Sequence, residues 1–185
     1  MASQSRSVDA ASVLSATVFT YDAADRLVKT SVSLTGGGSS NSLSLYDSTG
    51  RLVGSVDGEG FLTQYEYTKT NQLARTTRYA TKINATALAN ALGNTALATL
   101  ALLKPAANAA ADQVSYKVYD AADRLVKQVD AEGAVVEHVY DGTGRLVQTL
   151  SRATLLSATQ RSNLDRKSTR LNSSHATLSR MPSSA

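Results

Sequence analysis

Short stretches in which hydrophobic and polar residues alternate recur along most of the chain, separated by turns rich in Asp, Gly, Asn and Thr. The alternation is plainest in FLTQYEY at 61–67 and AVVEHVY at 134–140. A period of two places every second side chain on the same face, which is typical of a strand with one buried face. We therefore expect an all-β protein of short antiparallel strands, with Phe61, Tyr65 and Tyr67 sharing a face of one strand.

Five segments of the chain share the pattern Tyr-Asp-x-x-Gly-Arg-Leu, with small departures, and begin at Tyr21, Tyr46, Tyr67, Tyr119 and Tyr140. The second and third copies are 21 residues apart, and so are the fourth and fifth. A longer period of 73 residues relates the second and third copies to the fourth and fifth. Such periods indicate a repeat protein, in which each unit packs mainly against its neighbours.

Each copy of the pattern has the features of a tight turn between two strands. The Asp after the Tyr can accept a hydrogen bond from the backbone two residues on, which starts a turn. Four residues after the Tyr, the copies have a residue type that enters the left-handed region easily: Asp25, Gly50, Asn71, Asp123 and Gly144. We therefore predict hairpins whose short loop is closed by a left-handed residue, followed by a Leu that points to the buried face.

The other motif side chains have structural interpretations of their own. Since the chain has no Trp and eight Tyr, we expect the tyrosines to form the core of the sheet, although regularly spaced rings also suit the apolar face of a sugar. The repeated Arg is expected to form cross-strand pairs with the preceding Asp or Tyr. The residues predicted to carry the structural motif are Tyr21, Asp22, Arg26, Leu27, Tyr46, Asp47, Gly50, Arg51, Leu52, Tyr67, Leu73, Tyr119, Asp120, Arg124, Leu125, Tyr140, Asp141, Gly144, Arg145 and Leu146.

This pattern, followed by Asp-x-x-Gly and an alternating strand, resembles the signature of RHS/YD repeats. The best copies are 46–52 and 140–146, and the resemblance runs from about Phe19 to Thr154 with one interruption. Two copies have Asp in place of Gly, and the third has Thr68 in place of Asp. The resemblance implies antiparallel YD-repeat hairpins that form part of a spiral β-shell, of which this chain would be one piece of wall.

Two segments interrupt the repeat. TGGGSSNS at 35–42 is expected to be a flexible loop. The segment 83–112 is rich in Ala and Leu at helical spacings, with Asn84 and Asn94 as candidate caps and Pro105 as a break. We predict two or three short helices whose leucine side packs on the sheet; the alternative is a protruding element that contacts a partner or lipid.

The end of the chain differs from the rest. DRKSTRLNSSH and SRMPSSA, both within 165–185, resemble in this order two parts of a translated short-read sequencing adapter. We therefore expect a non-native, disordered tail, the alternative being a basic tail that binds nucleic acid or acidic lipid.

The expected division of the chain is 1–18 as an N-terminal segment, 19–82 as YD repeats, 83–112 as a helical insertion, 113–164 as YD repeats with the start of a second insertion, and 165–185 as the tail.

The charge of the chain does not point to a nucleic-acid partner. The segment 165–185 contains four of the 19 Lys and Arg residues and one of the 15 Asp and Glu residues, so 1–164 has a net charge of only +1. The segment 85–103 is too polar to span a bilayer. The N-terminus lacks the basic start and apolar run of a secretory signal.

We expect no catalytic, cofactor-binding or metal site. There is no Cys, and His138, inside an alternating strand, is expected to be a packed or solvated side chain. The acidic turns at 57–60 and 130–133 have two carboxylates each, too few for a calcium loop, so we interpret them as turns.

Function therefore rests on the family resemblance. It implies a non-enzymatic scaffold, part of a bacterial RHS-type protein whose shell encloses a C-terminal toxin or other cargo. The partners of this chain would be the neighbouring repeats of the parent protein and the enclosed domain. The parent protein would lie outside the cell or at its surface. The alternatives are a secreted or surface adhesin that binds carbohydrate or protein, including surface glycans, and a structural protein of the cell wall.

Overall fold

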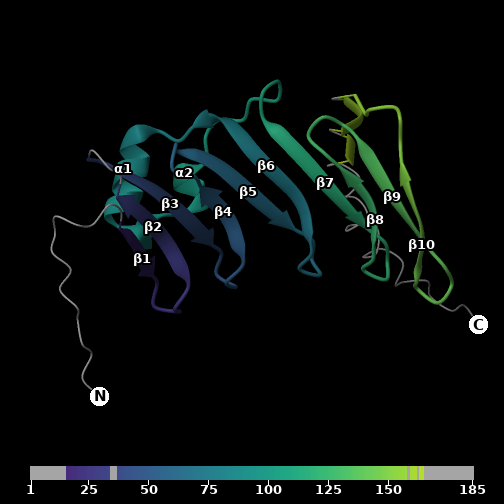
Figure 1. The fold of residues 1–185 in the computed structure, drawn as a ribbon, viewed down its shortest axis with the longest axis horizontal. Helices are drawn as coiled ribbons and strands as arrows, with labels where there is room; N and C mark the ends of the chain where they lie inside the picture. Colours follow the sequence, from purple (N-terminus) through teal and green to yellow (C-terminus); the bar gives the residue numbers. More distant parts are fainter. Residues whose placement is uncertain (1–15, 34–36, 158, 162, 165–185) are drawn as a thin grey trace, which may run out of the picture. The chain divides into compact units, whose positions relative to one another are not determined.

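The computed structural model describes residues 16–33, 37–157, 159–161 and 163–164. The predictions for the tail, and for most of the N-terminal segment, therefore lie outside the described residues. The elements are β1 (Thr17–Tyr21), β2 (Leu27–Ser33), β3 (Ser39–Tyr46), β4 (Leu52–Val56), β5 (Phe61–Tyr67), β6 (Leu73–Lys82), α1 (Ala85–Gly93), η2 (Thr95–Leu97), α2 (Leu100–Leu103), β7 (Gln113–Tyr119), β8 (Leu125–Val129), β9 (Val135–Tyr140) and β10 (Leu146–Ser151) (Figure 1).

The strands follow one another in the sheet in the order of the chain, from β1 to β10. The recorded pairings between consecutive strands are antiparallel. This confirms the predicted all-β fold of antiparallel hairpins with a short helical insertion. By its contacts the chain forms two compact units, one of Met1–Gln64 and Tyr79–Ala111 and the other of Tyr65–Arg78 and Asp112–Ala185.

The hydrophobic core of the first unit is formed by aliphatic side chains and one tyrosine. Leu62 of β5 is fully buried, and Tyr79 donates a hydrogen bond of 2.6 Å from its hydroxyl to Gln64 Oε1, which is also buried. Burial of a polar side chain such as Gln64 requires such a partner. The buried residues of this core are Leu43, Leu45, Val56, Leu62, Tyr79, Ile83, Ala91 and Leu103.

The helical insertion covers this core, as its leucine spacing predicts. Asn84 caps α1 by accepting hydrogen bonds from the amides of Thr86 and Ala87, and Asn94 caps η2. Ala91 of α1 and Leu103 of α2 are buried against the sheet. The prediction that the leucine side packs on the sheet is confirmed for Leu88, Leu92 and Leu100, whereas Leu97 is exposed. The described helices are all too short to cross a bilayer.

The second unit has a smaller core, with Tyr116, Val129 and Val135 buried and Leu156 and Leu164 packed against them. These positions follow those of the first core at the 73-residue period: Leu43, Val56, Leu62, Ile83 and Ala91 stand 73 residues earlier. The backbone repeats as well. The amide of Ile83 donates to Gly60 O at 2.9 Å, and that of Leu156 donates to Gly133 O at 2.8 Å.

Two predictions about the core are wrong for the motif residues, although Tyr79 and Tyr116, which lie outside the motif, are buried as predicted. Motif tyrosines such as Tyr46 and Tyr140 are only half-buried, and the motif leucines are half-buried or, in Leu146, exposed. The cause is a β-bulge beside the turn, where Tyr46 pairs with Leu52 while Leu45 pairs with Gly54. The extra residue places Leu52 on the face opposite the core. The following valine packs against the core instead, as Val53 does.

The predicted flexible loop at 35–42 is shorter than expected. Ser39 and the three residues after it belong to β3 and pair with β2. A side-chain bond supports this pairing, because the Ser31 hydroxyl of β2 donates to Asn41 Oδ1 of β3 at 2.6 Å. Within β3, Asn41 Nδ2 donates to the Ser39 hydroxyl at 3.1 Å. Serine and asparagine are common in loops, but here they extend the ladder.

Truncation of Leu103 to Ala is expected to destabilise the protein by about 2–5 kcal/mol, because it leaves a cavity beneath α2. The neighbouring Leu102 is 52% exposed and is the matched control. L102A is expected to change the free energy of unfolding by less than about 0.5 kcal/mol. Urea unfolding followed by circular dichroism measures both values. An equal loss of unfolding free energy in the two variants would show that α2 does not cover the core.

Candidate functional site: the contact between neighbouring hairpins

The turn that follows each motif tyrosine is a three-residue loop closed by a left-handed residue. In the first copy the amide of Asp25 donates to Asp22 O at 3.1 Å, and the amide of Asp22 donates to Arg26 O at 3.0 Å. This pattern is a type I turn followed by a bulge residue at positive φ. The prediction is confirmed in all five copies, with φ of 56° at Asp25, 85° at Gly50, 66° at Asn71, 60° at Asp123 and 85° at Gly144.

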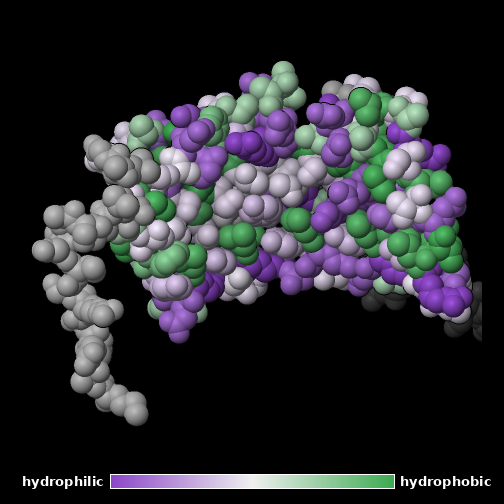
Figure 2. Space-filling model, in the orientation of Figure 1, coloured by the Kyte–Doolittle hydropathy of each residue, from purple (hydrophilic) through white to green (hydrophobic). Residues whose placement is uncertain are grey.

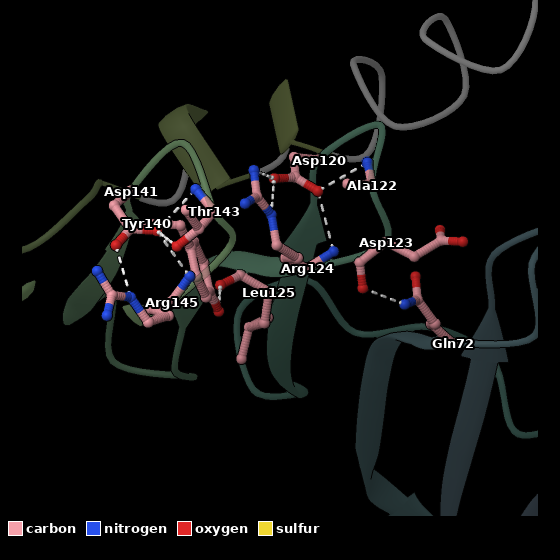
Figure 3. A network of polar contacts seen from close by, with 10 residues as sticks. All are labelled: Gln72, Asp120, Ala122, Asp123, Arg124, Leu125, Tyr140, Asp141, Thr143 and Arg145. Atoms are coloured by element: carbon pink, nitrogen blue, oxygen red, sulfur yellow. Dashed lines mark hydrogen bonds and ion pairs between the residues drawn. The ribbon is translucent and has the colours of Figure 1, made fainter. Parts of the chain in front are cut away.

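The aspartate of the motif holds both the loop and the arginine. In the fourth copy, Asp120 Oδ1 accepts hydrogen bonds of 2.9 Å from the amides of Ala122 and Arg124 (Figure 3). Its other oxygen, Oδ2, accepts from Arg124 Nε at 2.8 Å and lies 2.7 Å from Arg124 Nη2. One carboxylate thus satisfies the loop backbone and orients the guanidinium group.

The same arrangement recurs in three further copies, at Asp22, Asp47 and Asp141, with Nε–Oδ2 distances of 2.7, 2.7 and 2.9 Å to the arginine four residues on. Where Thr68 replaces the aspartate, its hydroxyl accepts a hydrogen bond of 3.0 Å from the amide of Gln72. The substitution therefore keeps the loop but has no carboxylate for an arginine. The predicted pairing of the repeated arginine with the preceding aspartate is confirmed.

The motif tyrosine joins its hairpin to the preceding one. The hydroxyl groups of Tyr46, Tyr119 and Tyr140 donate hydrogen bonds to backbone carbonyls on the adjacent strand, at 3.1, 2.9 and 2.9 Å. In each case the acceptor is the carbonyl of the motif leucine one hairpin earlier: Leu27, Leu73 and Leu125. Because the acceptor is a backbone atom, only the tyrosine side chain has to be specified.

The arginine of the preceding hairpin covers the same tyrosine ring. Arg26 lies 4.7 Å from the ring centroid of Tyr46, and Arg124 lies 4.8 Å from that of Tyr140. Such cation–π contacts stabilise a surface by about 0.5–1 kcal/mol each. We call this arrangement the inter-hairpin contact: a tyrosine that bonds to the preceding hairpin's leucine carbonyl under that hairpin's arginine. Sequence reasoning expected the tyrosine in the core and missed this contact.

The match to a known family falls on this motif. Residues 119–154, which hold the last two motif turns and the inter-hairpin contact of Tyr140, match the family model of the RHS repeat. This part of the chain therefore matches the RHS repeat. None of the curated proteins matches the chain.

Solved structures that are similar to this chain include two crystal structures and the structure of a pore. The crystal structure of TcdB2-TccC3-TEV is 16% identical over 75% of this chain, with a TM-score of 0.50. The Tc holotoxin pore of Photorhabdus luminescens is 18% identical over 69%, with a TM-score of 0.45. The crystal structure of TcdB2-TccC3 is 13% identical over 79%, with a TM-score of 0.47. The chain spans only 7%, 6% and 8% of the respective proteins.

A depression of about 360 Å³ lies in the second unit of the chain. Its lining includes Lys127, Glu137 and Arg152, with apolar contributions from Val135 and Leu156. Glu137 forms ion pairs with both cations, at 3.0 Å from Lys127 Nζ, and its pKa is lowered by the bonds from Lys127 and Arg152. All the charges of the depression are therefore paired with one another.

The remaining candidate residues of the sequence lie in strands and turns of the described part of the chain. The structure brings together no group of three or more His, Asp and Glu side chains suited to a metal among the described residues. His138 Nδ1 lies 3.4 Å from the Thr149 hydroxyl on the neighbouring strand. In the acidic turns, Asp57 Oδ1 accepts from the amides of Glu59 and Phe61, as the interpretation of these segments as turns predicts.

Removal of the tyrosine hydroxyl tests the inter-hairpin contact. Tyr140→Phe is expected to lower the free energy of unfolding by about 0.5–1.5 kcal/mol, because the Leu125 carbonyl loses its donor. Tyr21 has no hydrogen-bond partner among the described residues and is 57% exposed, so Tyr21→Phe is the matched control. Urea unfolding of dilute samples measures the free energy of unfolding of both variants. An unchanged Tyr140→Phe variant would contradict a stabilising role of the contact.

The motif aspartates also predict how stability depends on pH. The bond from the Thr143 hydroxyl and the bonds from Arg145 lower the pKa of Asp141 to about 2, and the bonds from Arg124 lower the pKa of Asp120. A carboxyl group whose pKa is lowered by folding contributes stability above its unfolded pKa of about 4. That contribution is lost as the pH falls through the folded pKa.

We therefore expect the urea midpoint to be level from pH 7 to about 5 and to fall between about pH 4 and 2. Asp141→Asn keeps an oxygen that can accept the loop hydrogen bonds but removes the charge. The variant should start from a lower midpoint at pH 7 and fall less steeply below pH 4. An identical acid slope in the two proteins would exclude Asp141 as a contributor.

Proposed function

We propose that this chain is a non-enzymatic structural segment of a bacterial RHS-type shell that encloses a C-terminal toxin or other cargo outside the producing cell. The observation that carries the proposal is the hydrogen bond from the motif tyrosine to the leucine carbonyl of the preceding hairpin, which recurs at Tyr46, Tyr119 and Tyr140. An arginine of the preceding hairpin covers the ring at Tyr46 and Tyr140. A contact of this kind allows hairpins to be added side by side. It therefore suits a long wall better than a single compact site.

The chemistry of the motif side chains supports a structural role. The aspartates are occupied by loop amides and arginines, and the arginines lie on tyrosine rings. Binding of a sugar would require free ring faces, whereas one face of the Tyr46 and Tyr140 rings is covered by a guanidinium group. The side chains that repeat most regularly are thus already used inside the sheet.

The shared fold with TcdB2-TccC3-TEV is consistent with such a segment, since this chain corresponds to 7% of that protein. In the parent protein, we propose, further YD hairpins flank the present ones and the helical insertion covers one face of the wall. The partners are then neighbouring repeats and an enclosed domain.

The test is to recover the complete coding region by long-read sequencing across the codon for Leu164, and then to express the full protein. We expect the YD hairpins to continue and to be followed by a C-terminal domain of unrelated sequence. Limited proteolysis of the native protein should spare that domain, whereas the same domain expressed alone should be digested. A surface anchor directly after the repeats, or equally rapid digestion of the domain in both forms, would refute the shell.

A further inference from the structure

The loop between α2 and β7 is exposed along its length and consists mostly of alanine. Residues 106–111, AANAAA, are all exposed, and Figure 2 shows the loop as pale green atoms that protrude from the surface. The bonds recorded within it are local: the amide of Ala110 donates to Asn108 Oδ1 at 3.2 Å, and that of Ala111 donates to Asn108 O at 3.0 Å. Exposed loops with small side chains are preferred sites of proteolytic nicking.

Two motif turns contain the same dipeptide as this loop and allow a comparison within the chain. Ala-Ala occurs at 106–107 in the loop, at 23–24 after Asp22 and at 121–122 after Asp120, and all six alanines are exposed. In each turn the aspartate accepts a hydrogen bond of 2.9 Å from the amide of the second alanine. Ala106 and Ala107 instead lie in neither a helix, a strand nor a turn.

This difference decides which of the three bonds a protease can reach. An endopeptidase has to hold its substrate in an extended form, as other extended peptides are bound. The two motif turns would first have to open, which breaks the bonds to the aspartate. The bond between Ala106 and Ala107 can be bound without that cost.

A cut in this loop would leave the buried residues of each core on one side. Those of the first core run from Leu43 to Leu103 and precede the loop, whereas Tyr116, Val129 and Val135 of the second core follow it. The second unit nevertheless contains residues from both sides of the loop, because Tyr65–Arg78 belongs to it together with Asp112–Ala185.

Strands β6 and β7 join the two sides of the loop within the second unit. They pair from Arg75 opposite Tyr116 to Arg78 opposite Gln113. The Tyr119 hydroxyl adds its bond of 2.9 Å to the Leu73 carbonyl. None of these contacts passes through the loop itself.

The turn of the third copy adds side-chain bonds to the turn of the fourth. Gln72, which stands in place of the motif arginine, donates from Nε2 to Asp123 O at 2.6 Å (Figure 3). The Thr70 hydroxyl donates to Asp123 Oδ1 at 2.9 Å. These bonds also connect a residue that precedes the loop with one that follows it.

We propose that the bond between Ala106 and Ala107 is a cleavage site for an endopeptidase that accepts small side chains, and that the two resulting chains stay joined through β6 and β7. Hydrolysis consumes one water, whose hydroxyl group adds to the carbonyl carbon of Ala106 while the amide nitrogen of Ala107 takes the proton. The new carboxylate and ammonium groups lie in an exposed loop, so the cut buries no charge.

Limited digestion of the full chain with elastase, whose specificity pocket is small, tests the proposal. Mass spectrometry of the products locates the cuts. Among cuts within 37–157, we expect the first between Ala106 and Ala107, with the bond between Ala121 and Ala122 intact. After the protease is inhibited, the nicked protein should elute from a size-exclusion column with the intact chain in native buffer, and as two fragments in guanidinium chloride.

A double variant tests the site itself. Ala106→Glu combined with Ala107→Glu should slow the cut about tenfold or more, because a small pocket rejects the longer side chains. Both positions are exposed, so the circular dichroism spectrum should not change. Ala121→Glu, which places the same side chain in a motif turn, is the matched control and should be cut at the wild-type rate.

The link between the two chains is tested on the nicked protein by dilution and sedimentation. Gln72→Ala should raise the dissociation constant of the fragments about fivefold, the effect of one hydrogen bond. Gln128→Ala, at an exposed glutamine of β8, is the control and should leave it unchanged. Equal dissociation constants in the two variants would contradict the role of Gln72.

Three results would overturn the proposal. One is a first cut between Ala121 and Ala122 or inside a strand. Another is a loop that stays intact at elastase concentrations that digest the urea-unfolded chain. The third is a nicked protein whose fragments separate in native buffer.

This inference goes beyond the proposed shell function and can fail separately from it. An uncut loop would leave the continuation of the repeats in the parent gene untouched. Conversely, a gene without cargo would leave the cleavage of this loop unchanged.

Discussion

The carboxylate of the aspartate that follows four of the five motif tyrosines connects the turn of a hairpin to the contact with the next hairpin. One of its oxygens holds the amides of a three-residue loop, and the other holds the arginine that covers the next tyrosine. These polar contacts are exposed to solvent and contribute little to stability, whereas burial of one leucine contributes about 1.5–3 kcal/mol. The core therefore supplies most of the stability, and the aspartate supplies the geometry that makes successive hairpins alike.

The turns could be predicted from the sequence because they depend on local chemistry. An Asp at the first position and an Asp, Gly or Asn at the left-handed position are enough to specify the loop, and all five left-handed residues occur as expected. The caps at Asn84 and Asn94 are of the same local kind. The helices could be predicted because their caps are specified by the local sequence. The side that packs on the sheet could be predicted from the spacing of the leucines.

The buried face could not be predicted in the same way. A bulge of one residue after each recorded motif leucine reverses the alternation of buried and exposed side chains. No residue type at these positions predicts the bulge. The sequence alone therefore places Leu52 and Tyr46 in the core, whereas Val53 and Leu45 pack there. The contact of a tyrosine with a backbone carbonyl was missed for a related reason, since its acceptor has no signature in the sequence.

The two units show how much such a repeat can vary while its backbone stays the same. Gln64 and Tyr79 form a buried neutral pair beneath the helices of the first unit. At the 73-residue period their places are taken by Glu137 and Arg152, which form an exposed ion pair. The main-chain bond from Ile83 to Gly60 nevertheless recurs between Leu156 and Gly133. Side chains of opposite character are thus accommodated on one backbone framework.

The use of a backbone carbonyl as the acceptor also bears on how an array of this kind can change in length. Every residue has such a carbonyl, so a hairpin with a Tyr-Asp turn does not need a neighbour with a matching side chain for this bond. Duplication or unequal recombination of a gene segment that encodes whole hairpins would then create junctions with the same bond as the original ones. Arrays of this kind can gain or lose hairpins without compensating substitutions at the new junction.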